Sequence, residues 1–439
     1  MNQKQFRLGC LTRHFLAYET PEFSFSSHMV VETSTRPELA RVVKTAEILF
    51  SEIPYLRSRI DGGQRTELEK NSFQWSRTVR DLGTVKMQDL SEVVGIKFNL
   101  ESEPALRFAI GTIENGNHFL VLSVHHALMD GLGQINLLNE FVLGYQGLPL
   151  SSWVKKPQDF LFSKALFRNL SPAQGVKLVL FSLKNLLKGS GGKGPSGSLA
   201  EKNGNTRSAR YFHILIDDKE MLIKKRANDF GFDGFFPFLL FCLFRVIDRM
   251  RSERKDVDLP LTALVPINLR TTFKIKRTFQ NIVGLGRIRF SSDEIRARTF
   301  SEALNHKIKS ELTPIKAFSL IMILGLTNRL VSFKKMKEFV LKREYGSNPA
   351  ASTIFVSAGK IPYFGGKRQF FDGFLRIERI YGYGSLTRSP GLGVILTGIP
   401  GKQVLTIQYL PDLFESKTIR SFCDQLWLEL TGETLNLDI

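Results

Sequence analysis

The sequence has few cysteines and no long apolar run, and these absences exclude several common classes of protein. The three cysteines, Cys10, Cys242 and Cys423, lie far apart and form no CxxC pair, which argues against a disulfide framework or a structural zinc site. The longest uncharged apolar runs, residues 234–244 and 317–328, are too short to span a bilayer. No apolar stretch follows the first charged residues, so we expect no export and a cytoplasmic location.

The composition is that of a folded globular protein, but the charge is unevenly distributed. The 439 residues are 43% apolar and 23% charged, and a chain of this length can form two domains. Residues 1–150 carry 15 Lys or Arg and 17 Asp or Glu, a net charge of −2, whereas residues 151–350 carry 37 and 17, a net charge of +20. This basic section predicts an anionic partner: nucleic acid, a membrane surface or a phosphate-bearing substrate.

Hydrophobic periodicity predicts strands and helices in both halves of the chain. The expected elements are a helix within 37–53, a strand near 56–60, a hairpin over 105–124 that turns at Asn115 and Gly116, and a helix over 133–147. A Gly/Ser-rich linker at 189–198 precedes a second half that begins near Tyr211. There we expect a strand at 211–216, two helices within 219–250, a strand ending at Arg270, a hairpin turning at Pro400 and Gly401, and a final helix over 415–430. This mixture predicts an α/β or α+β chain of two lobes.

The most specific pattern is HHxxxDG, at residues 125–131. An apolar strand leads to His125 and His126, and Asp130 and Gly131 follow at fixed spacing. A chance match to these four positions is expected in on the order of one chain in a thousand of this length. Polar residues between a strand and a helix commonly form sites. The alternative is that both histidines are ordinary residues at a strand end, which is the more frequent interpretation of a single histidine.

Other kinds of site have less support in the sequence. His126 and Asp130 have the chemistry of metal ligands, but no third ligand stands at a recognisable spacing. A Ser-His-Asp hydrolase needs a nucleophile, and the chain has neither GxSxG nor a cysteine in a reactive motif. No Gly-rich sequence forms a Walker or GxGxxG motif, and the basic residues match no known nucleic-acid-binding module.

The motif resembles the signature of the CoA-dependent acyltransferase superfamily. This superfamily includes chloramphenicol acetyltransferase, condensation domains of peptide synthetases, alcohol acetyltransferases and wax ester synthases. Weaker similarities occur at IPYLRSRI (53–60), PALRFAI (104–110), VPINLR (265–270), FQNIVG (279–284) and IQYLPDLFESKTIRSFCDQL (407–426). The resemblance covers most of the chain outside residues 155–205. The DFGWG motif of the plant branch is missing, so the chain resembles the bacterial members.

The resemblance implies a fold and a pair of substrates. The fold would be two chloramphenicol-acetyltransferase-like lobes in a V-shaped pseudodimer, with the active-site tunnel between them. Residues 1–154 would form the N-terminal lobe, residues 155–208 a basic connector and residues 209–439 the C-terminal lobe. The phosphopantetheine arm of acyl-CoA, or of an acyl carrier protein, would enter one face and the acceptor the other. Acyl-CoA would be a co-substrate, and we expect a monomer with no permanently bound cofactor or metal.

The resemblance also implies roles for the residues of the motif. His126 would be the general base that takes the proton of the acceptor as it attacks the thioester, because histidine titrates near neutral pH. Asp130 would form an ion pair with Arg270 across the lobes rather than contact the substrate. His125 would support the loop from behind, and Gly131 would allow a tight turn beside the donor arm.

Two further positions match the superfamily only in part. Asn281 lies in the segment after the strand that ends at Arg270, and we expect it to support the site. Many relatives carry a Ser/Thr-Asn pair followed by glycine near the crossover strand, whereas this chain has Val356 and Ser357. Ser357 and a backbone N–H near Gly131 are therefore the candidate donors to the oxyanion of the tetrahedral intermediate.

The basic segment 155–188 leaves two interpretations open. In one, apolar side chains insert into an anionic membrane and basic side chains flank them. In the other, these helices connect the lobes and pack on the protein with solvated lysines. The apolar residues are Phe160, Leu161, Leu166 and Phe167, and the flanking residues are Lys155, Lys156, Lys164 and Arg168. Residues 330–345 show the same pattern, which predicts peripheral binding at the inner membrane face.

The sequence therefore predicts an acyltransferase that moves an acyl group from a CoA thioester to an alcohol, which is a small molecule or a lipid. Two alternatives remain open. One is an amide-forming condensation enzyme that takes its donor from a carrier protein, and the other is a non-catalytic relative that only binds a ligand or carrier. The complete HHxxxDG motif favours an enzyme, and no nucleic-acid partner is expected.

Overall fold

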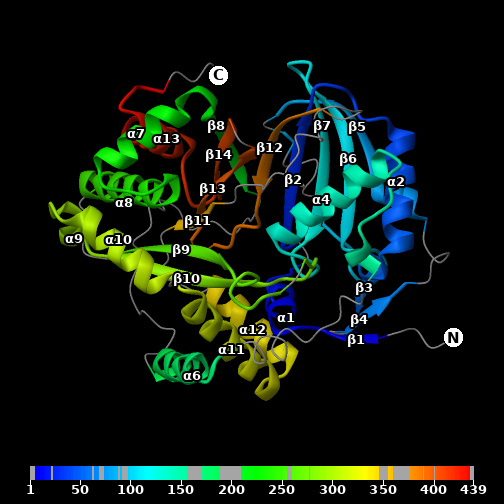
Figure 1. Cartoon of the computed structure of the whole chain (residues 1–439), viewed down its shortest axis with the longest axis horizontal. Helices are drawn as coiled ribbons and strands as arrows, with labels where there is room; N and C mark the ends of the chain where they lie inside the picture. Colours follow the sequence, from blue (N-terminus) through cyan, green and yellow to red (C-terminus); the bar gives the residue numbers. More distant parts are fainter. Residues whose placement is uncertain are drawn as a thin grey trace.

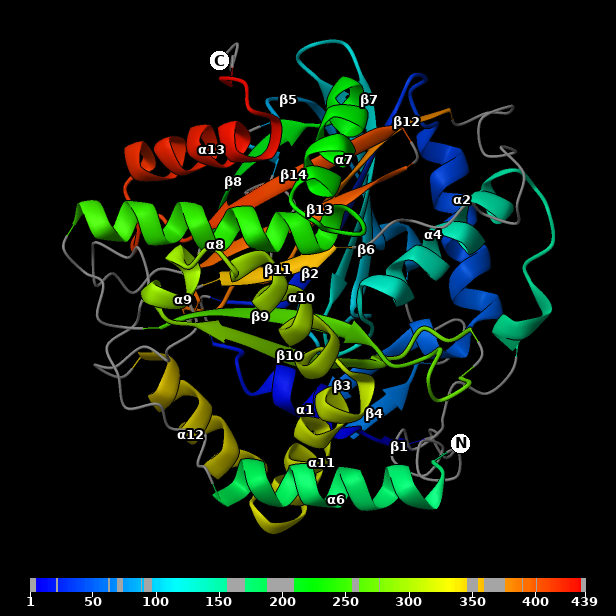
Figure 2. The ribbon, with the colours of Figure 1, turned by 60° about the vertical axis from the view of Figure 1, so that its left-hand side comes forward.

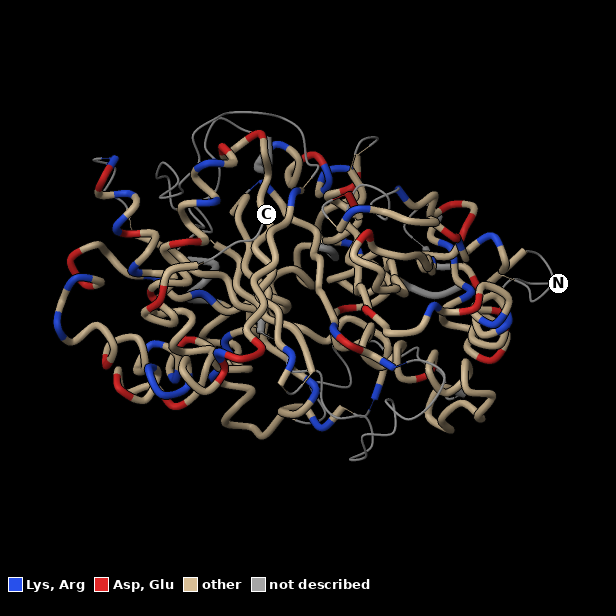
Figure 3. Tube along the Cα trace, turned by 90° about the horizontal axis from the view of Figure 1, so that it is seen from above, with Lys and Arg blue, Asp and Glu red and all other residues tan. Residues whose placement is uncertain are grey.

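Two mixed sheets organise the chain into two lobes that lie side by side (Figure 1). The computed structural model describes residues 5–20, 23–61, 64–68, 74–87, 89–90, 97–155, 170–187, 209–254, 260–275, 277–345, 354–358, 376–388, 390–399 and 401–435. Seen from above, strands run through the middle of the molecule with few charged residues, and charged residues are spread around the periphery (Figure 3). The two cores therefore lie between each sheet and its covering helices.

The first lobe contains a five-stranded sheet in the order β12-β2-β7-β6-β5. Its strands are β2 (Ser26–Thr33), β5 (Val79–Val85), β6 (Leu106–Ile113), β7 (His118–His125) and β12 (Ile377–Tyr383). The predicted hairpin is confirmed as β6 and β7, and Gly116 has the positive φ of 90° that its turn requires. Two helices, α2 (Leu39–Glu52) and α4 (Gly131–Tyr145), cover one face of this sheet (Figure 1). The buried face of α2 repeats at helical spacing, at Val42, Ala46 and Leu49.

Shorter elements follow α2 and complete this side of the molecule. The 3-10 turn η1 (Pro54–Arg57) leads into β3 (Ser58–Asp61), so the predicted helix-to-strand segment is confirmed. A three-stranded sheet in the order β1-β4-β3 includes β1 (Gln5–Arg7) and β4 (Gln64–Glu67). Two more 3-10 turns are η2 (Trp75–Thr78) and η3 (Ser152–Lys155).

The second lobe contains a six-stranded sheet in the order β10-β9-β11-β13-β14-β8. Its strands are β8 (Arg210–Leu215), β9 (Leu261–Asn268), β10 (Val283–Phe290), β11 (Ile354–Ala358), β13 (Leu392–Ile399) and β14 (Lys402–Tyr409). The helices of this lobe are α7 (Glu220–Asp229), α8 (Phe235–Glu253), α9 (Ser292–Arg296), α10 (Phe300–Glu311) and α13 (Ser416–Thr431), with the 3-10 turn η4 (Asp217–Lys219). The strands and helices predicted for the second half are confirmed, except that β9 ends at Asn268 rather than at Arg270. Pro400 of the predicted hairpin turn lies outside the described residues. The apolar run at 234–244 belongs to the buried core helix α8.

One strand crosses between the lobes. Strand β12 comes from the C-terminal half of the chain but pairs with β2 in the sheet of the first lobe, with Tyr381 opposite Val30. The Tyr383 hydroxyl of β12 lies 3.0 Å from Nε2 of His213 on β8. Periodicity cannot reveal such an exchange, because a strand has the same alternation whichever sheet it joins. The predicted end of the N-terminal lobe at residue 154 and the predicted start of the C-terminal lobe at residue 209 stay predictions.

A separate group of helices lies at the lower end of the molecule in Figures 1 and 2. These are α1 (Cys10–Leu16) and three helices that we name the basal helices: α6 (Pro172–Leu187), α11 (Pro314–Leu330) and α12 (Phe333–Tyr345). Helix α6 packs on α11, and α1 contacts both α11 and α12. Within the described ranges, no single helix is long and apolar enough to cross a membrane. Two consecutive helical segments, Phe300–Glu311 and Pro314–Thr327, reach the length and apolar composition of a membrane span only when they are combined, and they are bent by 54° relative to each other.

Candidate active site

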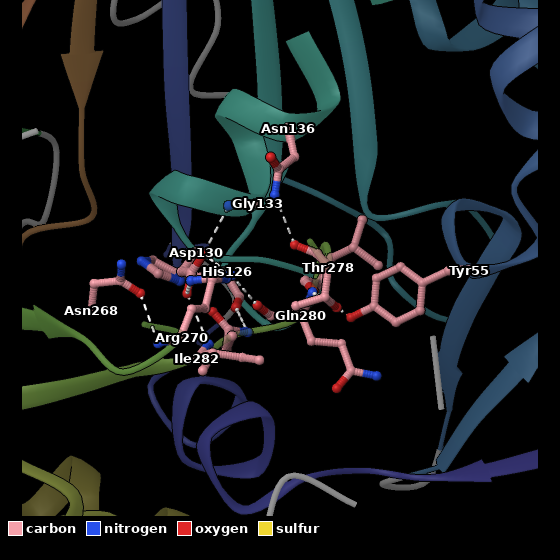
Figure 4. A network of polar contacts seen from close by, with 12 residues as sticks. Tyr55, His126, Asp130, Gly133, Asn136, Asn268, Arg270, Thr278, Gln280 and Ile282 are labelled. Atoms are coloured by element: carbon pink, nitrogen blue, oxygen red, sulfur yellow. Dashed lines mark hydrogen bonds and ion pairs between the residues drawn. The ribbon is translucent and has the colours of Figure 1, made fainter. Parts of the chain in front are cut away.

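The HHxxxDG residues form a loop between β7 and α4, where the two lobes meet (Figure 4). Strand β7 ends at His125, and α4 begins at Gly131 with Asp130 as its N-cap. The loop between β9 and β10 belongs to the second lobe, and its residues 277–282 lie against the start of α4. The motif therefore occupies the junction that the sequence predicted for it.

His125 holds this loop from behind. Its side chain is fully buried, and its Nδ1 accepts the N–H of Ala127 at 3.0 Å. The proton of the ring must therefore be on Nε2, which donates to the Glu19 carboxylate at 2.8 Å. The same carboxylate accepts the backbone N–H of Phe25. These contacts fit the supporting role expected for His125, and they identify Glu19 as its partner.

Three consecutive carbonyl groups of the loop are each bound by a side chain from a different part of the chain. The donors are Asn281 Nδ2 to the His126 oxygen at 2.7 Å, Thr12 Oγ1 to the Ala127 oxygen at 3.2 Å, and the Tyr55 hydroxyl to the Leu128 oxygen. The N–H of His126 donates to the Phe25 carbonyl at 2.8 Å. Because α1, η1 and the second lobe all contribute, the position of His126 depends on the assembled tertiary structure.

Asp130 and Arg270 form an ion pair between the lobes (Figure 4). Arg270 Nη2 and Nη1 donate to the two carboxylate oxygens at 2.8 and 3.0 Å, and both residues are buried. The carboxylate also accepts the N–H groups of Gly133 and Ile282, each at 2.8 Å. Arg270 Nη2 further donates to the Gln280 carbonyl at 2.7 Å. With four donors on its two oxygens, Asp130 is suited to fixing the loop rather than to transferring a proton.

Gly133, rather than Gly131, is the glycine that this junction requires. A Cβ atom at Gly133 would lie 2.4 Å from the carbonyl oxygen of Phe279 in the second lobe and 2.8 Å from Cβ of Met129. A Cβ atom at Gly131 would meet nothing within 4 Å, and its φ is not positive. The tight turn expected at Gly131 is therefore not observed, because the backbone there is an ordinary helix start. The close approach of the lobes occurs two residues later.

His126 lies among aromatic rings and has one enclosed nitrogen. The centroids of Phe15 and Phe25 are 4.6 and 5.5 Å from that of its ring. Nδ1 is buried without a hydrogen-bond partner among the described residues, which leaves Nε2 as the ring nitrogen available to a substrate. The pKa of His126 is lowered from 6.5, mainly because burial disfavours the charged form of the ring. The nearby His125 lowers this pKa further. The Asp130 carboxylate, the His126 carbonyl and the Asn281 side chain raise it and so oppose the shift. His126 is therefore neutral at pH 7 and can accept a proton.

Of the remaining predicted site residues, Asn281 forms a hydrogen bond with the HHxxxDG loop and, among the described residues, Ser357 does not. Asn281 is in direct contact with it, through the carbonyl of His126. Ser357 lies on β11 of the second sheet, opposite Ile395 of β13, and no hydrogen bond joins it to His126 in the part of the chain that the structure describes. The first two N–H groups of α4, on Gly131 and Leu132, are not used by the Asp130 cap, which binds the N–H of Gly133.

Comparison with known proteins supports this assignment of the fold. Residues 17–163 match the family model of the Condensation domain. No curated protein sequence matches the chain closely enough to be counted. Solved structures are similar over nearly the whole chain. The epimerization domain from the third module of tyrocidine synthetase B has a TM-score of 0.64 at 13% identity, covering 98% of this chain and 97% of that one.

Two other solved structures show the range of chemistry found on this fold. The TRI3 trichothecene 15-O-acetyltransferase from Fusarium sporotrichioides has a TM-score of 0.67 at 12% identity, covering 99% of this chain and 96% of that one. The EpoB cyclization-docking bidomain from Sorangium cellulosum has a TM-score of 0.63 at 14% identity, covering 98% and 86%. The predicted resemblance to the CoA-dependent acyltransferase superfamily and the predicted two-lobed fold are thereby confirmed.

Several residues around His126 were not predicted from the sequence. Phe15 and Thr12 on α1, Glu19 after it, and Phe25 before β2 all contact the motif loop or its histidines. They precede the motif by about a hundred residues in the sequence, and none belongs to a recognisable pattern. The close approach of the lobes at Gly133 did have a signal in the sequence. Gly133 is the second glycine of DGLG, and two glycines so close together at a helix start indicate a close backbone approach.

Proposed function

We propose that this protein is an acyltransferase that moves an acyl group from a CoA thioester to an alcohol, with His126 as the general base. The observation that carries the proposal is the state of His126: a neutral, half-buried ring with Nδ1 enclosed and Nε2 available, on a loop fixed from both lobes. A thioester is already activated for attack, so no covalent enzyme intermediate is needed. The essential requirement is a positioned base for the acceptor.

The proposed reaction has two steps. Nε2 of His126 takes the hydroxyl proton as the alcohol oxygen attacks the thioester carbonyl carbon, which gives a tetrahedral oxyanion and a protonated imidazole. The C–S bond then breaks, the carbonyl is restored as an ester, and the CoA thiolate leaves with the proton from His126. Atoms and charge balance without a metal or redox partner. Asn281, Asp130 and Arg270 act by positioning the loop.

The oxyanion needs hydrogen-bond donors, and the start of α4 supplies the better candidates. The N–H groups of Gly131 and Leu132 lie at the positive end of the helix dipole, where they favour a developing negative charge. No atom would lie within 4 Å of a Cβ at Gly131, so this position leaves room for a donor arm. Ser357, which was predicted from the sequence, stays the second candidate donor to the oxyanion.

A second candidate function uses a different donor. The match of residues 17–163 to the Condensation domain favours an acyl group carried on the phosphopantetheine of an acyl carrier protein, and then an amine is the expected acceptor. The base chemistry of His126 is the same in both cases. We also propose that the protein works in the cytoplasm as a monomer.

Purified protein should separate these candidates. We expect release of free CoA from a series of acyl-CoA donors when an alcohol is added, and an ester detected by mass spectrometry. The same acyl groups on a holo carrier protein, with alcohols and amines as acceptors, form the parallel assay. Turnover only with the carrier-bound donor would replace the CoA proposal with the second candidate. Turnover with neither donor, while each binds, would indicate the non-catalytic alternative.

A further inference from the structure

More than half of the exposed large apolar side chains in the described part of the chain lie on the basal helices. Six of the eleven large apolar side chains that are exposed in the described residues lie on α6, α11 and α12, which contain 46 residues in total. They are Val176, Val179, Leu180, Leu326, Leu330 and Phe339, with exposed fractions from 46% at Leu326 to 76% at Leu330. We name these six residues the basal face. Such a concentration of exposed apolar side chains is typical of an interaction surface.

The spacing of these residues shows that they lie on the outward sides of packed helices. Val176, Val179 and Leu180 share one side of α6, while Leu178 is buried in a cluster with Phe318 of α11. Leu326 and Leu330 are likewise one turn apart on α11. Helix α6 therefore uses one side to pack on the protein and leaves a second apolar side in solvent. It lies at the lower edge of the molecule in Figure 2. The interpretation of α6 as a packed connecting helix explains only the first side.

Basic residues accompany the basal face. The three helices together contain nine Lys or Arg and two Asp or Glu. Lys177, Lys334, Lys335 and Lys342 are exposed. Apolar side chains surrounded by lysines are typical of helices that lie in the interface of an anionic bilayer. The part of segment 155–188 that was predicted to insert lies outside the described residues. Its members are Phe160, Leu161, Leu166, Phe167, Lys156, Lys164, Arg168 and the side chain of Lys155.

The basal helices are connected to the candidate active site through α1. Phe15 of α1 packs on the His126 ring, with centroids 4.6 Å apart. On the side of the basal helices, the Cys10 thiol lies 3.8 Å from the carbonyl oxygen of Ile321 on α11, and the Arg13 guanidinium lies over the Phe333 ring of α12 at 5.8 Å. Helix α1 thus lies between the basal helices and the proposed base.

We propose that the basal face docks the protein on the surface of an anionic bilayer. Charge complementarity selects this occupant over an uncharged apolar partner, because the lysines would face the headgroups while the apolar side chains enter the acyl boundary. The docking does not depend on the proposed reaction. One consequence rests on the proposed function: the substrate that reaches His126 past α1 is then a long-chain, membrane-dissolved alcohol or acyl donor.

Vesicle flotation of the full-length protein tests this inference. The vesicles are phosphatidylcholine alone and phosphatidylcholine mixed with phosphatidylglycerol, at low and high salt. We expect flotation with the anionic vesicles at low salt and weaker flotation at high salt, since screening shortens to about 3 Å at 1 M. The triple variant Lys334→Gln, Lys335→Gln, Lys342→Gln should reduce the partition coefficient about 100-fold, at about fivefold for each lysine. Val179→Ser with Leu180→Ser should reduce it about tenfold or more.

Matched variants control for surface changes in general. Met221 on α7 is 74% exposed and Lys224 is an exposed lysine on the same helix, at the opposite end of the molecule (Figure 1). Met221→Ser and Lys224→Gln should float like the wild type, and so should His126→Ala. Circular dichroism checks that each variant is folded.

Two results would overturn the inference. One is no flotation with anionic vesicles at low salt. The other is a dimer in light scattering that Val179→Ser with Leu180→Ser converts to a monomer, because the basal face would then be covered by a second copy of the chain. Flotation without CoA release would contradict the proposed function and leave the docking intact, and CoA release without flotation would do the reverse.

Discussion

Replacing Asp130 with alanine is expected to destabilise the protein by about 3–5 kcal/mol. The change leaves the Arg270 guanidinium buried without its partner, and the N–H groups of Gly133 and Ile282 also lose an acceptor. An unpaired buried charge costs more than the pair contributed, because desolvation is no longer offset. The free energy of unfolding, measured by equilibrium chemical denaturation, reports the effect.

The exposed ion pair between Arg36 and Asp81 provides the matched control. Its side chains are 48% and 33% exposed, so Asp81→Ala should cost at most about 1 kcal/mol. In an Arg270→Met background, Asp130→Ala should cost clearly less than in the wild type, because no buried charge is left. If Asp130→Ala costs no more than Asp81→Ala, the ion pair does not hold the lobes together in the way that the structure indicates.

Replacing His126 with alanine is expected to reduce the rate of CoA release by 100-fold or more, which is the usual contribution of a general base. The loop should stay in place, because its contacts with Asn281 and Phe25 are made by the backbone of His126. The free energy of unfolding should therefore change far less than with Asp130→Ala. Steady-state release of free thiol measures the rate.

Two other histidines act as controls for this change. His118 starts the same strand and has a half-buried side chain near the Thr112 hydroxyl, so His118→Gln should keep nearly full activity. His125→Ala removes the partner of Glu19 and the acceptor of the Ala127 N–H, so it should act mainly through lower stability. A His126→Ala protein with full turnover on an acceptor used by the wild type would exclude His126 as the base.

Much of the fold and the centre of the site followed from local sequence patterns. The hairpin at Asn115 and Gly116 and the helix after HHxxxDG depend on residues that are adjacent in sequence, so periodicity and turn chemistry were enough to predict them. The pairing of Asp130 with Arg270 came from the resemblance rather than from spacing, since 140 residues separate them.

The remaining features depend on contacts that local patterns do not encode. Strand β12 joins the sheet of the other lobe, and its alternation does not specify its neighbour. Helix α1 is seven residues long, and its importance lies in what Phe15 and Thr12 touch. At Gly133 the constraint comes from the Phe279 carbonyl of the second lobe. The sequence predicted membrane binding at residues 155–188 and 330–345. Much of the first segment lies outside the described ranges, and only the structure shows which side chains of α6 are exposed.

The pH dependence of kcat/KM for acyl transfer tests the central claim most directly. A general base must be neutral, so the rate should rise with pH through the pKa of the free enzyme's base and then level off. Burial lowers the pKa of His126 below its ordinary value of 6.5, so we predict a midpoint below 6.5 in the wild type and the loss of this acid limb in His126→Gln. A midpoint at or above 6.5, or the same limb in His126→Gln, would contradict the assignment of His126 as a half-buried, neutral base.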